Sequence, residues 1–334
     1  MLLSDSNKSR LAIVLGNILS IPRALVVIVF LFASTNSYSN KIEHILFVLS
    51  KDTANYKKVV NIISTDWAAS KNYGYTVLIQ DQNTEIEKRL KTTDIVVTLG
   101  TVAADTVLSK KITQPVINTL ITQSAFDALA VKYYGDVTKA VASGINPIIL
   151  DQPFERRLNL VRKLSENSED SEKIVDIGIM LGPSAANKIS FYSDSVTQRK
   201  LKPQILLIDS DKNPIKQLDP VIRVSDVFIP IADSHFINVT TAKWILQLAY
   251  RQRVPVIGYS SNYVAAGALA SVYSSPEDVA KQSIELIDQL LTENYINQIH
   301  TPKYCTIKFN ETVAWHLSLT IPDKLRKNTG RCDL

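Results

Sequence analysis

Short apolar runs alternate with segments of helical spacing from residue 41 onward. The runs are strand-like in length, and each ends in a small or polar residue or is followed by one; they cover 42–50, 75–80, 94–100 and 115–121. Between them, apolar residues recur at helical spacing in 56–70, 84–90 and 101–109. Strands that alternate with helices predict a parallel sheet covered by helices on both faces.

The alternation restarts after the run at 143–150. Residues 151–164 read as a helix with Asp151 as N-cap and a buried stripe of Phe154, Leu158, Val161 and Leu164. Further strands are predicted at 175–181, 203–210, 226–232 and 254–260, with a helix at 240–252. No low-complexity linker lies at the seam near residue 147, which indicates a hinge between two α/β units. The last predicted elements, a helix at 275–291 and a strand at 303–310, are expected to pack back onto these units.

The first forty residues differ from the rest of the chain. Basic residues precede an uninterrupted apolar run at 24–33, and Ser37 and Ser39 follow it. This order is typical of a secretory signal peptide, here 1–39 with cleavage after Ser39. The alternative is an uncleaved anchor over 11–33. An anchor would bury Arg23, at about 2.5–3.5 kcal/mol for a central arginine.

Charge and cysteine content restrict the partners. The net charge of +5 is spread along the chain without a basic block interleaved with aromatics, so a nucleic-acid partner is not expected. Cys305 and Cys332 lie in no metal-ligand pattern. After export they could pair, which would stabilise the fold by about 3–4 kcal/mol, or remain two free thiols.

The strand ends of both units are rich in hydroxyl residues and glycine. In open parallel sheets, ligands bind at the carboxyl ends of strands, beside exposed helix N-termini. Asp233 is the candidate carboxylate for a cationic ligand group, although it could simply cap a helix. The other candidates could equally be ordinary helix caps; they are Ser50, Gly100, Thr101, Thr122, Ser184, Tyr259 and Ser260.

Catalytic motifs are absent from the sequence. There is no GxSxG, phosphate-binding loop or GxGxxG pattern. His235 is too close in sequence to Asp233 to form an oriented acid–base pair with it. We therefore expect no catalytic residue, no cofactor and no metal.

The order of several motifs resembles the ABC-transporter substrate-binding family whose better-known members bind tryptophan or tyrosine. The motifs are DIVVTLGTVAA (94–104), ILDQPFERRLNLVRKL (149–164), IGIMLGPSA (177–185), DVFIPIADSHF (226–236) and KFNETVAWHLSLTIPD (308–323). The resemblance implies a type I periplasmic binding fold, with two Rossmann-like lobes joined by a three-crossing hinge. The implied lobes are 40–147 plus 263–300, and 148–262 plus 301–334. One departure is Ile231 and Ala232, where family members commonly have Pro and Thr.

The resemblance implies a monomeric periplasmic protein that binds a small molecule, such as an aromatic or other hydrophobic amino acid, and delivers it to an ABC permease. One alternative is a sensor of the same fold that signals to a membrane receptor or kinase. An exported enzyme would need a catalytic pair across the lobes. A repressor effector domain is disfavoured because an export signal, rather than a helix-turn-helix, precedes the first strand.

Overall fold

The computed structural model describes residues 44–165, 174–209, 211–232, 239–293 and 296–327. The signal peptide expected at 1–39 lies outside these residues. Across the described ranges, no helix has both the length and the apolar character needed to span a membrane.

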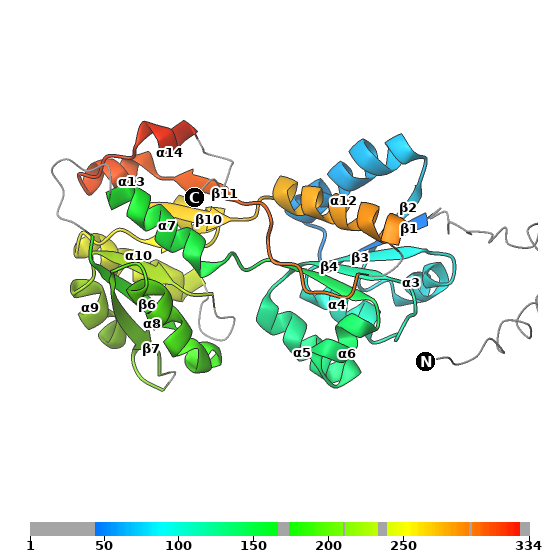
Figure 1. The fold of residues 1–334 in the computed structure, drawn as a ribbon, viewed down its shortest axis with the longest axis horizontal. Helices are drawn as coiled ribbons and strands as arrows, with labels where there is room; N and C mark the ends of the chain where they lie inside the picture. Colours follow the sequence, from blue (N-terminus) through cyan, green and yellow to red (C-terminus); the bar gives the residue numbers. More distant parts are fainter. Residues whose placement is uncertain (1–43, 166–173, 210, 233–238, 294–295, 328–334) are drawn as a thin grey trace, which may run out of the picture. The chain divides into compact units, whose positions relative to one another are not determined.

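The first lobe is built on a five-stranded parallel sheet with strand order β2-β1-β3-β4-β5 (Figure 1). Its strands are β1 (His44–Leu49), β2 (Gly74–Ile79), β3 (Ile95–Leu99), β4 (Val116–Ile121) and β5 (Ile145–Ile149). The central strands β1 and β3 are almost wholly buried. Burial on both faces explains why they are continuous apolar runs rather than alternating ones.

Helices cover both faces of this sheet. One face packs against α2 (Ala54–Asn61), the π-helical segment Ile62–Ala68 that continues it, and α12 (Pro276–Glu293). On this face Trp67 donates a 3.2 Å hydrogen bond to Asp288 of α12, which ties a late helix to an early one. The other face carries α3 (Asn83–Leu90), α4 (Thr101–Leu108), α5 (Gln123–Tyr134) and α6 (Val137–Ala142).

The second lobe contains the parallel sheet β7-β6-β8, extended through a bridge between Phe228 and Val256 to the sheet β9-β10-β11. Its strands are β6 (Asp176–Leu181), β7 (Lys202–Leu207), β8 (Val227–Pro230), β9 (Ile257–Gly258), β10 (Ala270–Tyr273) and β11 (Thr306–Phe309). Strand β11 runs antiparallel to β10.

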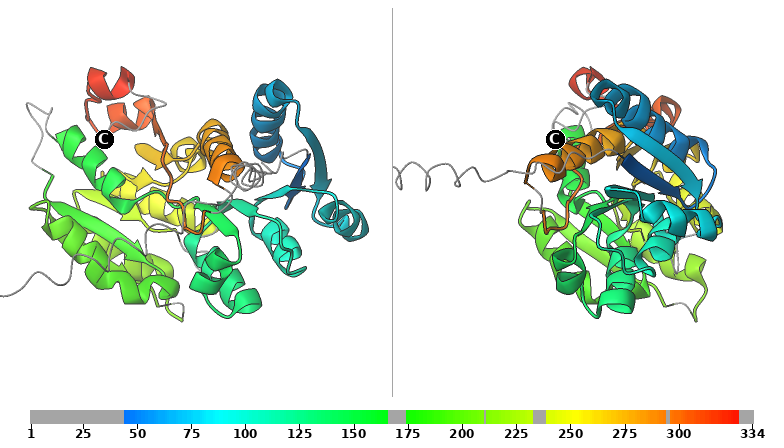
Figure 2. Two further views of the ribbon diagram at one scale, coloured as in Figure 1. Left: turned by 45° about the vertical axis from the view of Figure 1, so that its right-hand side comes forward. Right: turned by 90° about the vertical axis from the view of Figure 1, so that its right-hand side faces the viewer.

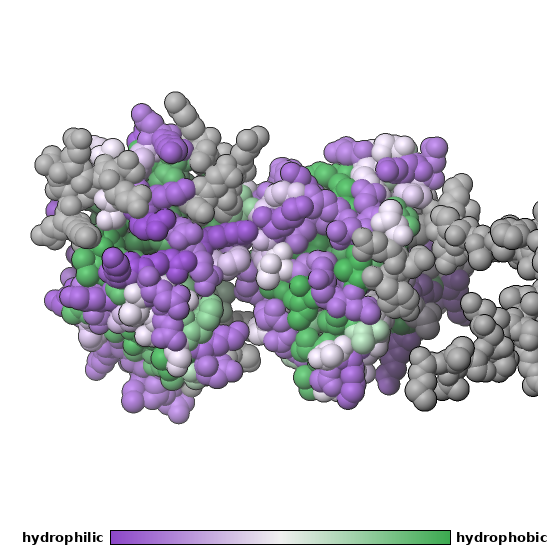
Figure 3. All heavy atoms as spheres, viewed as in Figure 1, coloured by the Kyte–Doolittle hydropathy of each residue, from purple (hydrophilic) through white to green (hydrophobic). Residues whose placement is uncertain are grey.

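Two apolar clusters pack around the strands of the second lobe. The helices of this lobe, seen from two further sides in Figure 2, are α7 (Phe154–Ser165), α8 (Ile189–Thr197), α9 (Pro214–Arg223), α10 (Val239–Arg251), α11 (Ser261–Ala265), α13 (Glu311–His316) and α14 (Asp323–Lys327). On the face of the molecule in Figure 3, hydrophilic residues predominate and apolar residues show in smaller groups. This is the distribution expected of amphipathic helices around buried sheets.

The structure corrects one expected lobe boundary. Residues 263–273 were assigned to the first lobe, but β10 pairs with β9 and β11, and Tyr263 packs in an apolar cluster of the second lobe. The chain therefore returns to the first lobe after Tyr273, just before α12. Helices α5 and α6 and strand β10 were not predicted from the pattern.

Three described segments connect the two lobes: the link between β5 and α7, the link between β10 and α12, and the residues between His300 and β11. His300 forms a parallel bridge with Ile148 of the first sheet before the chain crosses.

Cys305, at the end of the third segment, is 2 % exposed and disulfide-bonded. The other cysteine of the sequence, Cys332, lies outside the described residues.

Candidate functional site

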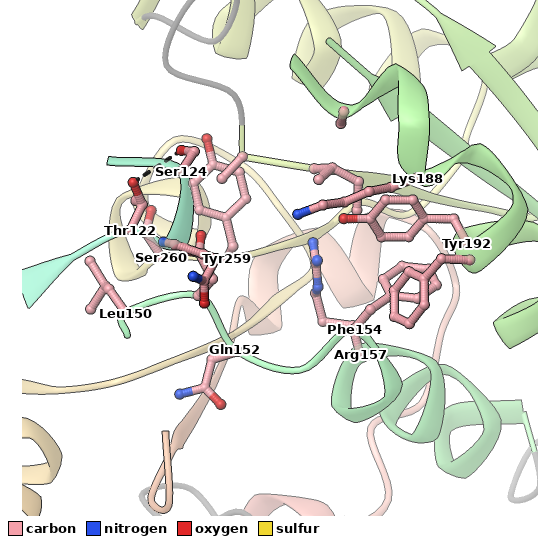
Figure 4. A pocket seen from close by; sticks show the side chains of 16 residues that line it. Thr122, Ser124, Leu150, Gln152, Phe154, Arg157, Lys188, Tyr192, Tyr259 and Ser260 are labelled. Atoms are coloured by element: carbon pink, nitrogen blue, oxygen red, sulfur yellow. Dashed lines mark hydrogen bonds between the residues drawn. The ribbon is translucent and has the colours of Figure 1, made fainter. Parts of the chain in front are cut away.

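A cavity of about 370 Å³ lies at the carboxyl ends of β4, β5 and β8 and is lined by residues of both lobes (Figure 4). Its volume is in the range of small-molecule sites. The lining residues are Thr122, Gln123, Ser124, Leu150, Asp151, Gln152, Phe154, Arg157, Ala185, Lys188, Phe191, Tyr192, Ile231, Ala232, Tyr259 and Ser260.

An irregular strand end places the first-lobe hydroxyl groups at the cavity. The pairing of β4 with β5 shifts register between Asn118 and Ile121, and Leu120 has a positive φ of 55°. A non-glycine residue with positive φ is held there by its surroundings, and such residues cluster at functional sites. Directly afterwards, Thr122 caps α5 by accepting a hydrogen bond from the Ala125 N–H.

Asp151 caps a different helix from the one predicted. The sequence suggested that it caps 151–164, but α7 begins at Phe154, and Asp151 Oδ2 accepts a 2.7 Å hydrogen bond from the Gln123 N–H. The carboxylate thus lies at the positive end of α5, where a negative charge is stabilised. The first crossing is thereby attached to the first turn of that helix.

The turn from Gly258 to Ser260 forms another part of the wall. Ser260 caps α11 by accepting from the Tyr263 N–H, and the Tyr259 and Tyr263 rings lie 4.9 Å apart. A Cβ atom on Gly258 would lie 2.6 Å from both Ser271 Oγ and Tyr263 Cβ. Any larger residue at position 258 would therefore push Ser271 or Tyr263 away, which explains why the turn has glycine there.

Aromatic side chains from α7 and α8 form the opposite part of the wall. The rings of Phe154 and Tyr192 meet edge to face with their centroids 4.9 Å apart, and the centroids of the Phe191 and Tyr192 rings are 5.2 Å apart. Burial raises the pKa of Tyr192, so its hydroxyl is neutral at physiological pH. This wall can stack against an apolar or aromatic ligand body.

The structure brings together only some of the predicted site residues. Thr122, Tyr259 and Ser260 line the cavity. Ser184 lies in the 3₁₀ turn Pro183–Lys188, and its side chain is outside the described part of the chain, as is the whole of Asp233.

Ser50, Gly100 and Thr101 do not line this cavity. Ser50 Oγ instead accepts a 2.8 Å hydrogen bond from the Ala103 N–H in the first turn of α4, and Gly100 precedes that helix with a φ of 91°. Ser50 thus satisfies an N–H group in the first turn of α4, which fits the alternative interpretation of this residue as a helix cap.

Sequence reasoning missed the cationic groups of the cavity, Arg157 and Lys188. The sequence did contain a signal for the first. Arg157 stands three residues after Phe154 and one before Leu158, on the predicted buried stripe of its helix. A charge on a buried helix face requires an explanation in terms of partners or function.

Among the described residues, no group of three or more His, Cys, Asp or Glu side chains is placed to hold a metal ion.

Gln152 connects the cavity wall to all three crossings. It lies on the first crossing, and its Nε2 donates to Ser274 Oγ on the second at 2.7 Å and to the Tyr304 carbonyl on the third at 3.2 Å. Its Oε1 accepts from Arg156, which also donates to the Lys303 carbonyl. The Gln152 amide therefore links the first crossing directly to the second and the third.

Replacing Gln152 with alanine should loosen the hinge without unfolding either lobe. The substitution removes three hydrogen bonds, two of which join different crossings, and should raise amide hydrogen exchange about 10-fold in the crossings, and little elsewhere. Hydrogen-exchange mass spectrometry measures this directly. Gln114→Ala is the matched control, since Gln114 Nε2 donates one bond, to Leu90 within the first lobe. Equal protection of the crossings in both variants would contradict the hinge role.

Comparison with known proteins identifies the class. The profile of the family described as ABC transporter substrate binding protein matches residues 76–332, and the chain belongs to this family. No curated protein matches the chain in sequence.

Solved structures of the same fold agree with this assignment. A domain from Streptococcus pneumonia determined with L-Trp is 17 % identical, with a TM-score of 0.55 over 86 % of this chain and 99 % of that one. A ligand-free, open substrate-binding protein with adhesive properties from Clostridium difficile is 14 % identical, with a TM-score of 0.63 over 84 % and 96 %. The fold is the two-lobed type I periplasmic binding fold expected from the sequence.

Proposed function

We propose that this protein is exported, captures an aromatic or other hydrophobic amino acid in the cavity of Figure 4, and delivers it as a monomer to an ABC permease. The observation that carries the proposal is a cavity with walls from both lobes, aromatic on one side and lined with hydroxyls on the other. Such a site combines apolar contact with a few polar groups that fix orientation. The relative from Streptococcus pneumonia with bound L-Trp supports the choice of ligand.

The mechanism follows from the connections between the lobes. A ligand that contacts Thr122 and Tyr259 together bridges groups from both lobes, so it favours the conformation in which both can reach it. The permease then distinguishes the loaded protein by its shape. No bond is made or broken in this cycle.

Thermal-shift screening of the protein without residues 1–39 tests the ligand assignment. The screen covers the common amino acids and their aromatic analogues, followed by calorimetry of each hit. A binder at 100 times its dissociation constant should add about 2.7 kcal/mol to the free energy of unfolding. Stabilisation by sugars alone would contradict the proposed ligand class.

The mass of the exported protein tests the localisation. Cleavage after Ser39 leaves Asn40 as the first residue, whereas an uncleaved anchor keeps the full chain in the membrane fraction.

A further inference from the structure

Arg157 is a buried charge in the wall of the ligand cavity. The residue is 5 % exposed, and in Figure 4 its side chain extends from α7 into the cavity between Tyr259 and Tyr192. One terminal nitrogen donates a 2.8 Å hydrogen bond to the Pro230 carbonyl, while Nε has no hydrogen-bond partner. Its guanidinium carbon lies 5.4 Å from the Phe154 ring centre.

Within the described ranges, no carboxylate forms an ion pair with Arg157. Asp151 acts on Arg157 electrostatically, but the two side chains are not within ion-pair distance, and the hydrogen bond that Asp151 Oδ2 accepts comes from the Gln123 N–H. A buried charge without a counter-charge costs several kcal/mol, and a neutral donor could satisfy the Pro230 carbonyl equally well. The part of the fold that the structure describes therefore gives no reason for a guanidinium at this position.

The surroundings of Arg157 indicate what would neutralise it. Lys188 adds a second cationic side chain to the same cavity, and Phe154, Tyr192 and Tyr259 supply apolar ring surface. Guanidinium groups bind carboxylates through paired, charge-assisted hydrogen bonds, which are strong where water is excluded. The cavity thus suits a molecule with an anionic head and an apolar body.

We propose that Arg157 binds the carboxylate of the ligand and that this carboxylate, rather than the ammonium group, is what the site requires. The proposal rests on the function proposed above and narrows it: aromatic organic acids bind with or without an α-amino group. The positive charge of Lys188 adds to the attraction for the carboxylate, and the aromatic side chains of the cavity select the apolar part of the ligand.

Three probes with one indole body separate the two charged groups. L-Tryptophan carries both groups, 3-indolepropionate carries only the carboxylate, and tryptamine carries only the ammonium. Calorimetry on the wild-type protein should give similar affinities for the two acids, and an affinity for tryptamine about 100-fold lower.

Arg157→Gln should weaken both acids by about 100-fold and leave tryptamine within about 3-fold of its wild-type affinity. Arg157→Lys should recover part of the preference for acids. Arg89→Gln is the matched control: it removes the same charge from an exposed pair with Glu85 on α3 and should change none of the affinities. Tryptamine binding as tightly as the acids, or equal losses for all three probes in Arg157→Gln, would overturn the proposal.

Unfolding of the ligand-free protein separates this proposal from the proposed function. If the counter-charge of Arg157 comes from a ligand, the ligand-free Arg157→Gln variant should melt at or above the wild-type temperature, because the substitution removes a buried charge that has no counter-charge in the ligand-free protein. A drop of more than about 3 °C would show that Arg157 already has its counter-charge or supports the fold, and would overturn the proposal. If none of the indole probes binds, the aromatic ligand class of the proposed function is wrong. The melting comparison then decides by itself whether Arg157 is an anion site for a ligand with a different apolar part.

Discussion

Replacing Gly100 with alanine should lower the free energy of unfolding by roughly 2–4 kcal/mol. Gly100 has a φ of 91°, where side chains are strained, and its new Cβ would lie 2.6 Å from Tyr56 Oη and 2.7 Å from Ser50 Oγ. Moving Ser50 would break its hydrogen bond with the Ala103 N–H, and a buried donor would lose its partner. Chemical denaturation followed by circular dichroism measures the change.

Gly135→Ala is the matched control for this substitution. Gly135 has nearly the same φ, 88°, but the nearest atom to a new Cβ would be Lys139 Nζ at 3.8 Å. The free energy of unfolding of Gly135→Ala should therefore fall only by the cost of backbone strain, on the order of 1 kcal/mol. If the two variants lose the same stability, the packing around Ser50 and Tyr56 contributes nothing, and the interpretation of Gly100 as a packing residue is wrong.

Replacing Cys332 with serine should remove about 3–4 kcal/mol of stability. Cys305 is disulfide-bonded, and the sequence contains one other cysteine. Without the bond, the chain between the two residues regains its freedom in the unfolded state. The melting temperature should fall by on the order of 10 °C.

Calorimetric scans with and without dithiothreitol check this result. Reduced wild-type protein should melt at the same temperature as the Cys332→Ser variant, and dithiothreitol should not change the melting temperature of the variant. A wild-type melting temperature insensitive to the reductant, after free-thiol titration has shown complete reduction, would refute a stabilising role of the bond.

The sheets could be predicted because buried parallel strands are uninterrupted apolar runs. Strand β10 was missed because Ala270–Tyr273 has only four residues, and it forms a strand by pairing with β9 and β11. Helix α5 was missed because its buried residues are few, Phe126, Leu129 and Ala130, and because the apolar Val131 is exposed, so apolar positions do not mark a single face. In each case the tertiary surroundings, rather than the local pattern, determine the structure.

The candidate site was harder to predict than the fold. Hydroxyls and glycines after strands serve both to cap helices and to bind ligands, so composition could not separate Ser50, which caps α4, from Thr122, which also lines the cavity. The aromatic wall depends on how α7 and α8 pack, which no local pattern reveals. Arg157 was also missed, although the sequence contained a signal for it, a charge on a predicted buried stripe.

The hydrogen bond from Gln123 to Asp151 has a consequence for how the molecule bends. Asp151 lies in the first crossing, whose backbone torsions would change in any rotation of one lobe relative to the other. Gln123 is the first residue of α5, which packs in the first lobe. A change in the backbone torsions of residues 149–153 must therefore either move the first turn of α5 as well or break this hydrogen bond. Thr122 and Ser124 lie in or beside that first turn and line the cavity, so a rotation about residues 149–153 that keeps this bond would also shift their hydroxyl groups.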